Sequence, residues 1–105
     1  MAFRGGIQEL MKQANRMQTK LERMREEIKD QEIIGQALDG KVKAIVNGNR
    51  ELLRVQFEMA DFEDDIEMLQ DTIVAAVNDG MKKADELIDD ETKKVTGGLK
   101  LPGFF

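Results

Sequence analysis

The segment IQELMKQANRMQTKLERMREEI, residues 7–28, carries apolar side chains in a strict alternation of three-residue and four-residue steps. The members of this apolar seam are Ile7, Leu10, Ala14, Met17, Leu21, Met24 and Ile28. A period of 3.5 residues places all of them on one narrow stripe of an α-helix, the pattern expected when one helix packs lengthwise against another. We therefore predict a helix over about residues 7–30, roughly 35 Å long. Its seam needs a partner helix, either from the same chain or from a second copy.

After this helix the apolar period changes to two, which is typical of strands with one buried face. The apolar residues of these short runs are Ile33, Ile34, Val42, Ala44, Val46, Leu53, Val55 and Phe57. They predict strands over about 31–37, 41–47 and 51–58. Asp39-Gly40 and Asn47-Gly48-Asn49 lie between the strands, and these residue types tolerate positive φ. We therefore expect two tight hairpin turns and an antiparallel meander.

The helical period returns for a second amphipathic helix over about residues 64–96, in which Gly80 is unfavourable to helix formation. Asp61, Asp64 or Asp65 would cap its start, and Gly97-Gly98 suits its end. Residues 1–6 are expected to form a mobile lead-in, and residues 97–105 a short apolar tail. The predicted fold class is α+β, in the order α-β-β-β-α, with two long amphipathic helices and a small three-stranded antiparallel sheet.

Length and composition limit the possible classes of protein. A chain of 105 residues is most simply one domain, 1–105, with a modest core. It has no cysteine, which excludes disulfides and thiolate metal sites and fits a cytoplasmic protein. Its apolar runs are too short to predict a signal peptide or a membrane span, so we expect no membrane contact.

A small sheet of short strands covers only part of two long helices, so apolar stripes and open sheet edges would remain exposed in a monomer. A symmetric homodimer is the simplest remedy. The alternative is that the methionine-rich seam is ordinary core packing within one chain.

The sequence does not predict an enzyme. It contains no His, Cys, Ser, Tyr or Trp, so the usual nucleophiles and the near-neutral general base are missing. The acidic run Glu63-Asp64-Asp65 with Glu67 lacks the alternating ligands and central glycine of a calcium loop. We expect no metal, no cofactor and no small-molecule substrate.

Charge is unevenly distributed along the chain, whose net charge is −5. Residues 1–31 hold seven Lys/Arg against five Asp/Glu, whereas residues 59–105 hold five Lys against twelve Asp/Glu. On the first helix Lys12, Arg16 and Arg23 lie away from the seam, one or two turns apart, where they could contact successive phosphates of a nucleic acid. The alternative is that the basic side chains only solvate the helix and pair with its glutamates.

Several short motifs, in their order and spacing, resemble one family over nearly the whole chain. They are Gly5-Gly6, Leu10-Met11-Lys12-Gln13-Ala14, Met17-Gln18, Glu26-Glu27-Ile28, Gly40-Lys41-Val42-Lys43, Asn47-Gly48, Glu63-Asp64-Asp65, Glu67-Met68-Leu69, Ala75-Ala76, Asn78-Asp79, Gly98-Leu99 and Leu101-Pro102-Gly103-Phe104. This pattern is similar to that of the YbaB/EbfC family of bacterial nucleoid-associated proteins. The resemblance implies a small cytoplasmic homodimer with projecting, tweezer-like helices that binds double-stranded DNA with limited sequence specificity and contributes to nucleoid organisation and gene regulation.

The resemblance also extends the candidate DNA-binding residues. Lys82 and Lys83 occupy the basic stretch that follows Asn-Asp in relatives, and they could join Lys12, Arg16, Lys20 and Arg23; the alternative is that they only keep the helix surface soluble. Two positions depart from the family pattern, since Met59 replaces a usual proline and Gly80 a usual alanine. The acidic last helix leaves open a second hypothesis, a protein-interaction adaptor that binds a basic DNA-repair or replication partner. A small oligomeric scaffold without any partner is a third.

Overall fold

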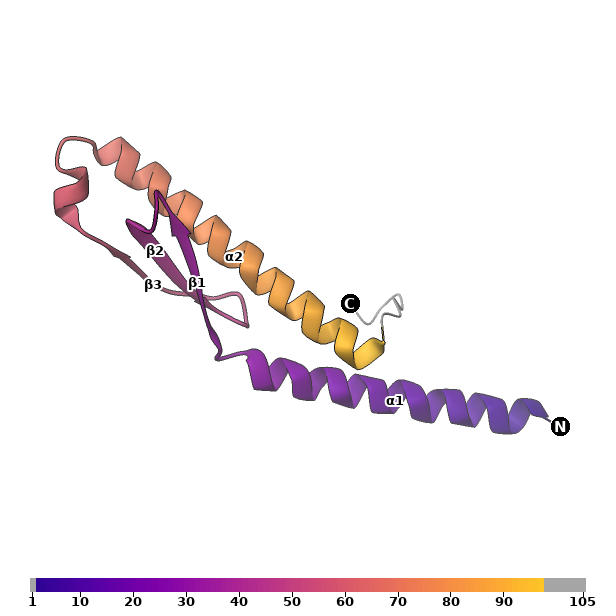
Figure 1. Ribbon diagram of the computed structural model, residues 1–105. Coiled ribbons are helices and arrows are strands. Elements are labelled where there is room, and N and C mark those ends of the chain that lie inside the picture. Colours follow the sequence, from indigo (N-terminus) through magenta and orange to yellow (C-terminus); the bar gives the residue numbers. More distant parts are fainter. Residues whose placement is uncertain (1, 98–105) are drawn as a thin grey trace.

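The computed structural model describes residues 2–97 and confirms the predicted α-β-β-β-α order (Figure 1). The elements are α1 (Ala2–Ile28), β1 (Glu32–Ala37), β2 (Val42–Asn47), β3 (Leu52–Phe57), the short 3-10 helix η1 (Met59–Phe62) and α2 (Ile66–Thr96). The expected tail beyond Gly97 lies outside the described residues. The chain is long and narrow, with principal extents of 77 × 20 × 17 Å.

The first helix begins earlier than the sequence suggested. Residues 2–6 belong to α1, so the prediction of a mobile lead-in there is wrong. Glycine lowers helix propensity by only about 1 kcal/mol relative to alanine. Gly5 and Gly6 therefore weaken the first turns without preventing them from forming. The 3-10 helix η1 was not predicted, and it buries Phe62 beneath the start of α2.

The three strands form one antiparallel sheet in the order β1-β2-β3, with a bulge between Ile45 and Val46. The first turn is as predicted, because Asp39 and Gly40 both have positive φ. The second predicted hairpin turn also forms, between β2 and β3, with positive φ on Arg50 and not on the Asn47-Gly48-Asn49 run. Gly48 is needed for another reason: a Cβ there would collide with the carbonyl group of Ile28.

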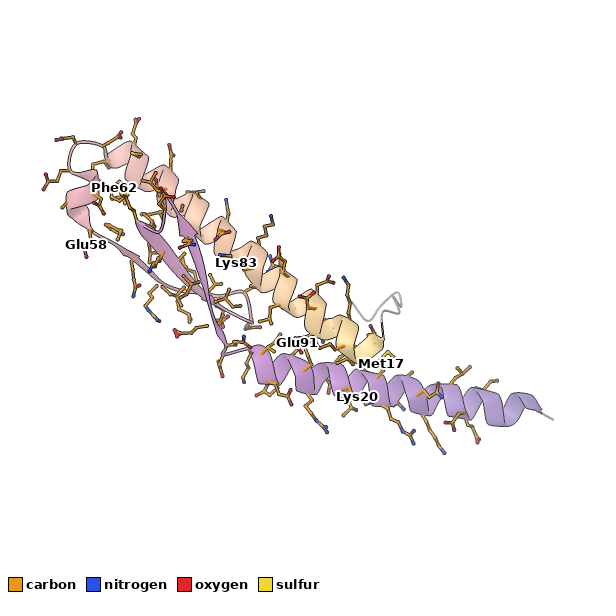
Figure 2. The ribbon with its side chains drawn as sticks, in the orientation of Figure 1. Met17, Lys20, Glu58, Phe62, Lys83 and Glu91 are labelled. Carbon is orange, nitrogen blue, oxygen red and sulfur yellow. The ribbon has the colours of Figure 1, made fainter. Side chains whose placement is uncertain are left out.

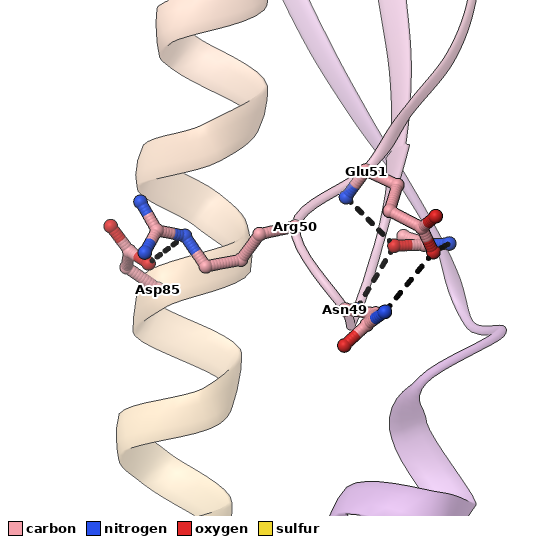
Figure 3. Close-up of polar contacts among 5 residues, drawn as sticks. Asn49, Arg50, Glu51 and Asp85 are labelled. Carbon is pink, nitrogen blue, oxygen red and sulfur yellow. Dashed lines mark hydrogen bonds and ion pairs between the residues drawn. The ribbon is translucent and has the colours of Figure 1, made fainter.

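The side chain of Asn47 holds the second turn together (Figure 3). Its Oδ1 accepts hydrogen bonds from the backbone N–H groups of Asn49 and Glu51, each at 3.0 Å, and its Nδ2 donates to Glu51 Oε1 at 3.0 Å. The amide donors of Asn47 and Asn49 lower the pKa of the Glu51 carboxyl. Arg50 extends from the turn to α2, where its Nε lies 2.9 Å from Asp85 Oδ1. The turn thus ties the sheet to the second helix.

The α2 helix packs over β1 and β2, and the core lies between them. On β2 the alternate residues Val42, Ala44 and Val46 are fully buried. Gly35 of β1 allows the backbone of α2 to approach β1 very closely, since a Cβ at this position would collide with backbone atoms of Gly80 and Ala76. Gly80 is therefore a packing position as well as a weak helix former.

The C-terminal half of α1 packs against the last turns of α2. Leu21, Met24 and Ile28 are buried in this second apolar cluster. Its half-buried members are Met17, Leu87, Ile88 and Val95. By contrast, Ile7 is 57 % exposed and Leu10 is 65 % exposed. Only half of the apolar seam therefore has a partner helix within the described chain.

Both ends of α2 are capped. Asp65 accepts a hydrogen bond from the Met68 backbone N–H at 2.9 Å, which selects Asp65 among the three predicted caps. Gly97 is left-handed, with φ 64°, and its N–H donates to the Lys93 carbonyl group. This geometry is typical of a glycine that ends a helix.

Candidate nucleic-acid interface

Lys12, Arg16, Lys20 and Arg23 form what we call the basic row, and all four are exposed on α1. At about 100° per residue they lie within roughly 80° of one another. Lys12, Arg16 and Arg23 lie on the side of α1 away from the apolar seam, and Lys20 lies nearer to the seam. Their positions span about 16 Å of helix at about 1.5 Å per residue. In the described part of the chain no carboxylate lies within 4.0 Å of any of the four cationic groups.

The surroundings of the basic row favour an anionic partner. Residues 10–21 contain three cations and no Asp or Glu. On the same side of the helix the nearest acidic positions, Glu9 and Glu27, lie beyond the two ends of the row. Glu26 is engaged elsewhere, with its Oε1 2.6 Å from Lys29 Nζ. The row is therefore a local positive surface on a chain whose net charge is negative.

Sequence reasoning missed one basic neighbour of this row. Lys20 and Arg23 line a shallow groove of about 290 Å³ together with Lys94, from the last turn of α2. Glu27 and Glu91 line the same groove, and Glu91 Oε1 accepts a hydrogen bond from Lys94 Nζ at 2.9 Å, so part of the positive charge is neutralised. Lys94 is distant in the sequence, and only the packing of α2 on α1 brings it here.

Lys82 and Lys83 are not part of this surface, because they lie on α2 where it covers the sheet. Figure 2 shows Lys83 midway along α2 and Lys20 on α1. Lys83 Nζ lies 3.0 Å from Asp79 Oδ2 and donates to the Ile34 carbonyl group at 3.3 Å. Lys82 is exposed. The structure therefore brings together four of the six predicted DNA-binding residues.

The same contacts close the outer edge of the sheet at β1. The backbone N–H of Gln36 donates a hydrogen bond to Asp79 Oδ2 at 2.9 Å, and Lys83 Nζ donates one to the Ile34 carbonyl group. The Gln36 N–H and then the Lys83 ammonium lower the pKa of the Asp79 carboxyl. Side chains of α2 thus satisfy edge groups that would otherwise be available to another strand.

The opposite flank, between α2 and β3, is apolar and open. We call it the apolar flank, and its residues are Leu52, Val55, Phe57, Ile73, Val74 and Val77. Val55, Ile73 and Val77 are half-buried against the core, while Val74, on the side of α2 away from Asp79, is 58 % exposed. The core is therefore left uncovered on this side.

Two other kinds of feature are absent from the described residues. No helix there is long and apolar enough to cross a membrane. Among residues 2–97 no group of three or more Asp or Glu side chains is arranged to hold a metal ion.

Comparisons with known proteins agree on one family. The model of the YbaB/EbfC DNA-binding family matches residues 4–99. A nucleoid-associated protein of Acetivibrio thermocellus is 42% identical over 106 residues, covering 98% of this chain and 93% of its own length. One from Clostridium novyi is 43% identical over 100 residues, covering 94% and 88%. The crystal structure of an uncharacterized protein from Helicobacter pylori superposes with a TM-score of 0.62 at 27% identity, covering 73% of this chain and 90% of that one.

Proposed function

Because this chain belongs to the YbaB/EbfC DNA-binding family, we propose that it is a homodimeric, non-catalytic nucleoid-associated protein of the bacterial cytoplasm that binds double-stranded DNA. Contacts to phosphates supply the affinity, with little reading of base sequence. In this way it contributes to nucleoid organisation and gene regulation.

The observation that supports this mechanism is the unpaired basic row of α1. Lys12 and Arg16 lie on the part of α1 that projects beyond α2, where a duplex can approach without meeting the acidic residues of α2. Lysine and arginine contacts to phosphate release condensed counterions, which gives affinity without sequence information. The net charge of −5 is compatible with this mechanism because the basic row is locally uncompensated.

The adaptor hypothesis receives less support. It needs free carboxylates on α2, but several of them are already paired. Asp85 pairs with Arg50, Asp89 with Lys93 and Glu91 with Lys94. A basic protein partner that used these three carboxylates would have to displace their cations.

A salt series tests the proposed function. A dimer presenting two basic rows offers up to eight phosphate contacts, so the slope of log affinity against log salt should be about −7. The measurement is fluorescence anisotropy of a labelled mixed-sequence duplex at several salt concentrations. Affinity that is independent of salt would contradict phosphate binding and favour the adaptor.

We place the dimer interface at the apolar flank. The β1 edge is closed by Asp79 and Lys83, so the sheet offers its free edge and its uncovered core on the β3 side. A second copy related by a twofold axis would cover both apolar flanks at once. Each protomer would then still project its own α1.

Val74→Glu is expected to convert the dimer to a monomer. In the dimer a carboxylate on the apolar flank would be buried without a charged partner. The free energy gained on association would not offset the cost of that burial. The side chain is 58 % exposed in a single chain, so the fold should persist. Sedimentation velocity at micromolar concentration should show a shift to the monomer.

Ala75→Glu is the matched control, because Ala75 is the next residue, is exposed, and points to the other side of α2. It adds the same charge and should leave the dimer intact. If both variants stay dimeric, the interface lies elsewhere.

A further inference from the structure

The first part of α1, residues 2–16, is an arm that projects beyond the end of α2 (Figure 1). In proteins most of the stability of a helix comes from tertiary packing of its apolar face and not from helix propensity. This arm includes Gly5 and Gly6, which weaken it. It nevertheless continues the apolar seam through Ile7 and Leu10, both more than half exposed. An apolar cover on this part of the seam would therefore stabilise the arm.

The end of α2 lies beside the point where the covered part of the seam stops. Val95 packs in the cluster of Leu21 and Met24, with Met17 at its border. The two helices run antiparallel, so the C-terminal end of α2 points along the arm toward the N-terminus (Figure 1). Gly97 then ends the helix in a left-handed conformation. Val95, two residues before Gly97, and Met17 therefore border the same apolar cluster, and residues 98–105 follow in the sequence.

That following chain has the composition of a covering segment. Residues 98–105 read GLKLPGFF and contain two leucines, two phenylalanines and one charged residue, Lys100. Eight extended residues reach about 26 Å. The seam from Met17 back to Ile7 is about 15 Å long. The segment is therefore long enough and apolar enough to cover the exposed half of the seam.

We infer that residues 98–105 dock along the apolar seam of the arm of the same chain, between Met17 and Ile7. This position leaves Lys12 and Arg16 free, because these two members of the basic row lie on the other side of the arm. The dimer interface proposed above, at the apolar flank on the β3 side, uses a different surface of the chain. The docked segment stiffens the arm and holds its basic side in place, and the inference stands whether or not the protein binds DNA.

Engineered disulfides test the inference, because the chain has no cysteine of its own. Leu10→Cys with Phe104→Cys should form a disulfide in a glutathione buffer, while the control Lys12→Cys with Phe104→Cys, on the opposite side of α1, should form it at least about tenfold more slowly. Mixing isotopically light and heavy chains before oxidation identifies the chain that supplies each cysteine. Equal rates in the two variants, or links only between light and heavy chains, would overturn docking within one chain.

Hydrogen exchange in the full-length chain gives a second readout. Phe104→Asp with Phe105→Asp should speed amide exchange at residues 7–16 by about tenfold or more, as expected for a local opening that has lost its cover. Residues 21–28 should be unchanged, because α2 covers them. Lys100→Asp is the control, since it adds a carboxylate to the same segment without removing an apolar group. Unchanged exchange at residues 7–16 in the double variant would overturn the inference.

Discussion

Lys12→Glu combined with Arg16→Glu is expected to weaken duplex binding by at least about 100-fold at moderate salt. Both cations lie on the arm of α1, and in the described part of the chain neither has a carboxylate within 4.0 Å. The change removes two phosphate contacts per protomer and adds two repulsive charges to the same surface. In a dimer the salt slope should become shallower by about 3.6. Anisotropy titrations across a salt series measure both effects.

A second pair of variants separates the effect of net charge on DNA binding from the effect of where the charge lies on α1. Lys12→Gln with Arg16→Gln changes the charge of the chain by the same amount as Asn15→Glu with Gln18→Glu, on the same stretch of α1. The glutamine pair removes two members of the basic row, whereas the glutamate pair keeps all four members and adds one carboxylate beside Lys12, at Asn15, and one on the far side of the helix, at Gln18. We expect the glutamine pair to weaken binding more. Equal weakening would show that only the overall charge matters.

The elements of the fold could be predicted because their signals are local. A spacing of three and four residues at Ile7–Ile28 and an alternation of two around Val42–Val46 depend only on helix and strand geometry. The structure accordingly has both helices and all three strands, with boundaries that differ by a few residues except at the start of α1.

Other features depend on how the elements meet, and no local pattern reveals them. Periodicity marks Ile7 and Leu21 alike as seam residues, but only Leu21 has α2 beside it. Lys83 matches a basic stretch of the family pattern, yet its ammonium group is bound to Asp79 and to the Ile34 carbonyl group at the edge of β1. The candidate interface was predictable as a row on one helix. Its neighbour Lys94 was not.

Gly35 is another residue whose role depends on how two elements meet. Gly35→Ala is expected to destabilise the protein strongly. A Cβ at this position would collide with the backbone nitrogen and Cα of Gly80 and with the carbonyl oxygen of Ala76. These are backbone atoms of α2, so no side chain can rotate away and the helix itself must lift from the sheet. Overpacking a core typically costs about 1–3 kcal/mol and occasionally more. We expect a loss of about 3 kcal/mol, measured by urea denaturation at fixed protein concentration.

Gly80→Ala is the matched control, because it adds the same methyl group on the other side of the same contact. There the nearest atoms are the Val46 side chain, with Cγ1 at 3.2 Å, and Gly35 Cα at 3.5 Å. A small shift of Val46 can accommodate the methyl group, and alanine improves helix propensity by about 1 kcal/mol. The two effects oppose each other, so the change in unfolding free energy should stay within about 1 kcal/mol. If Gly35→Ala were equally mild, α2 would not rest backbone to backbone on β1. The closing of the β1 edge by Asp79 and Lys83, which the proposed dimer interface assumes, would then be in question.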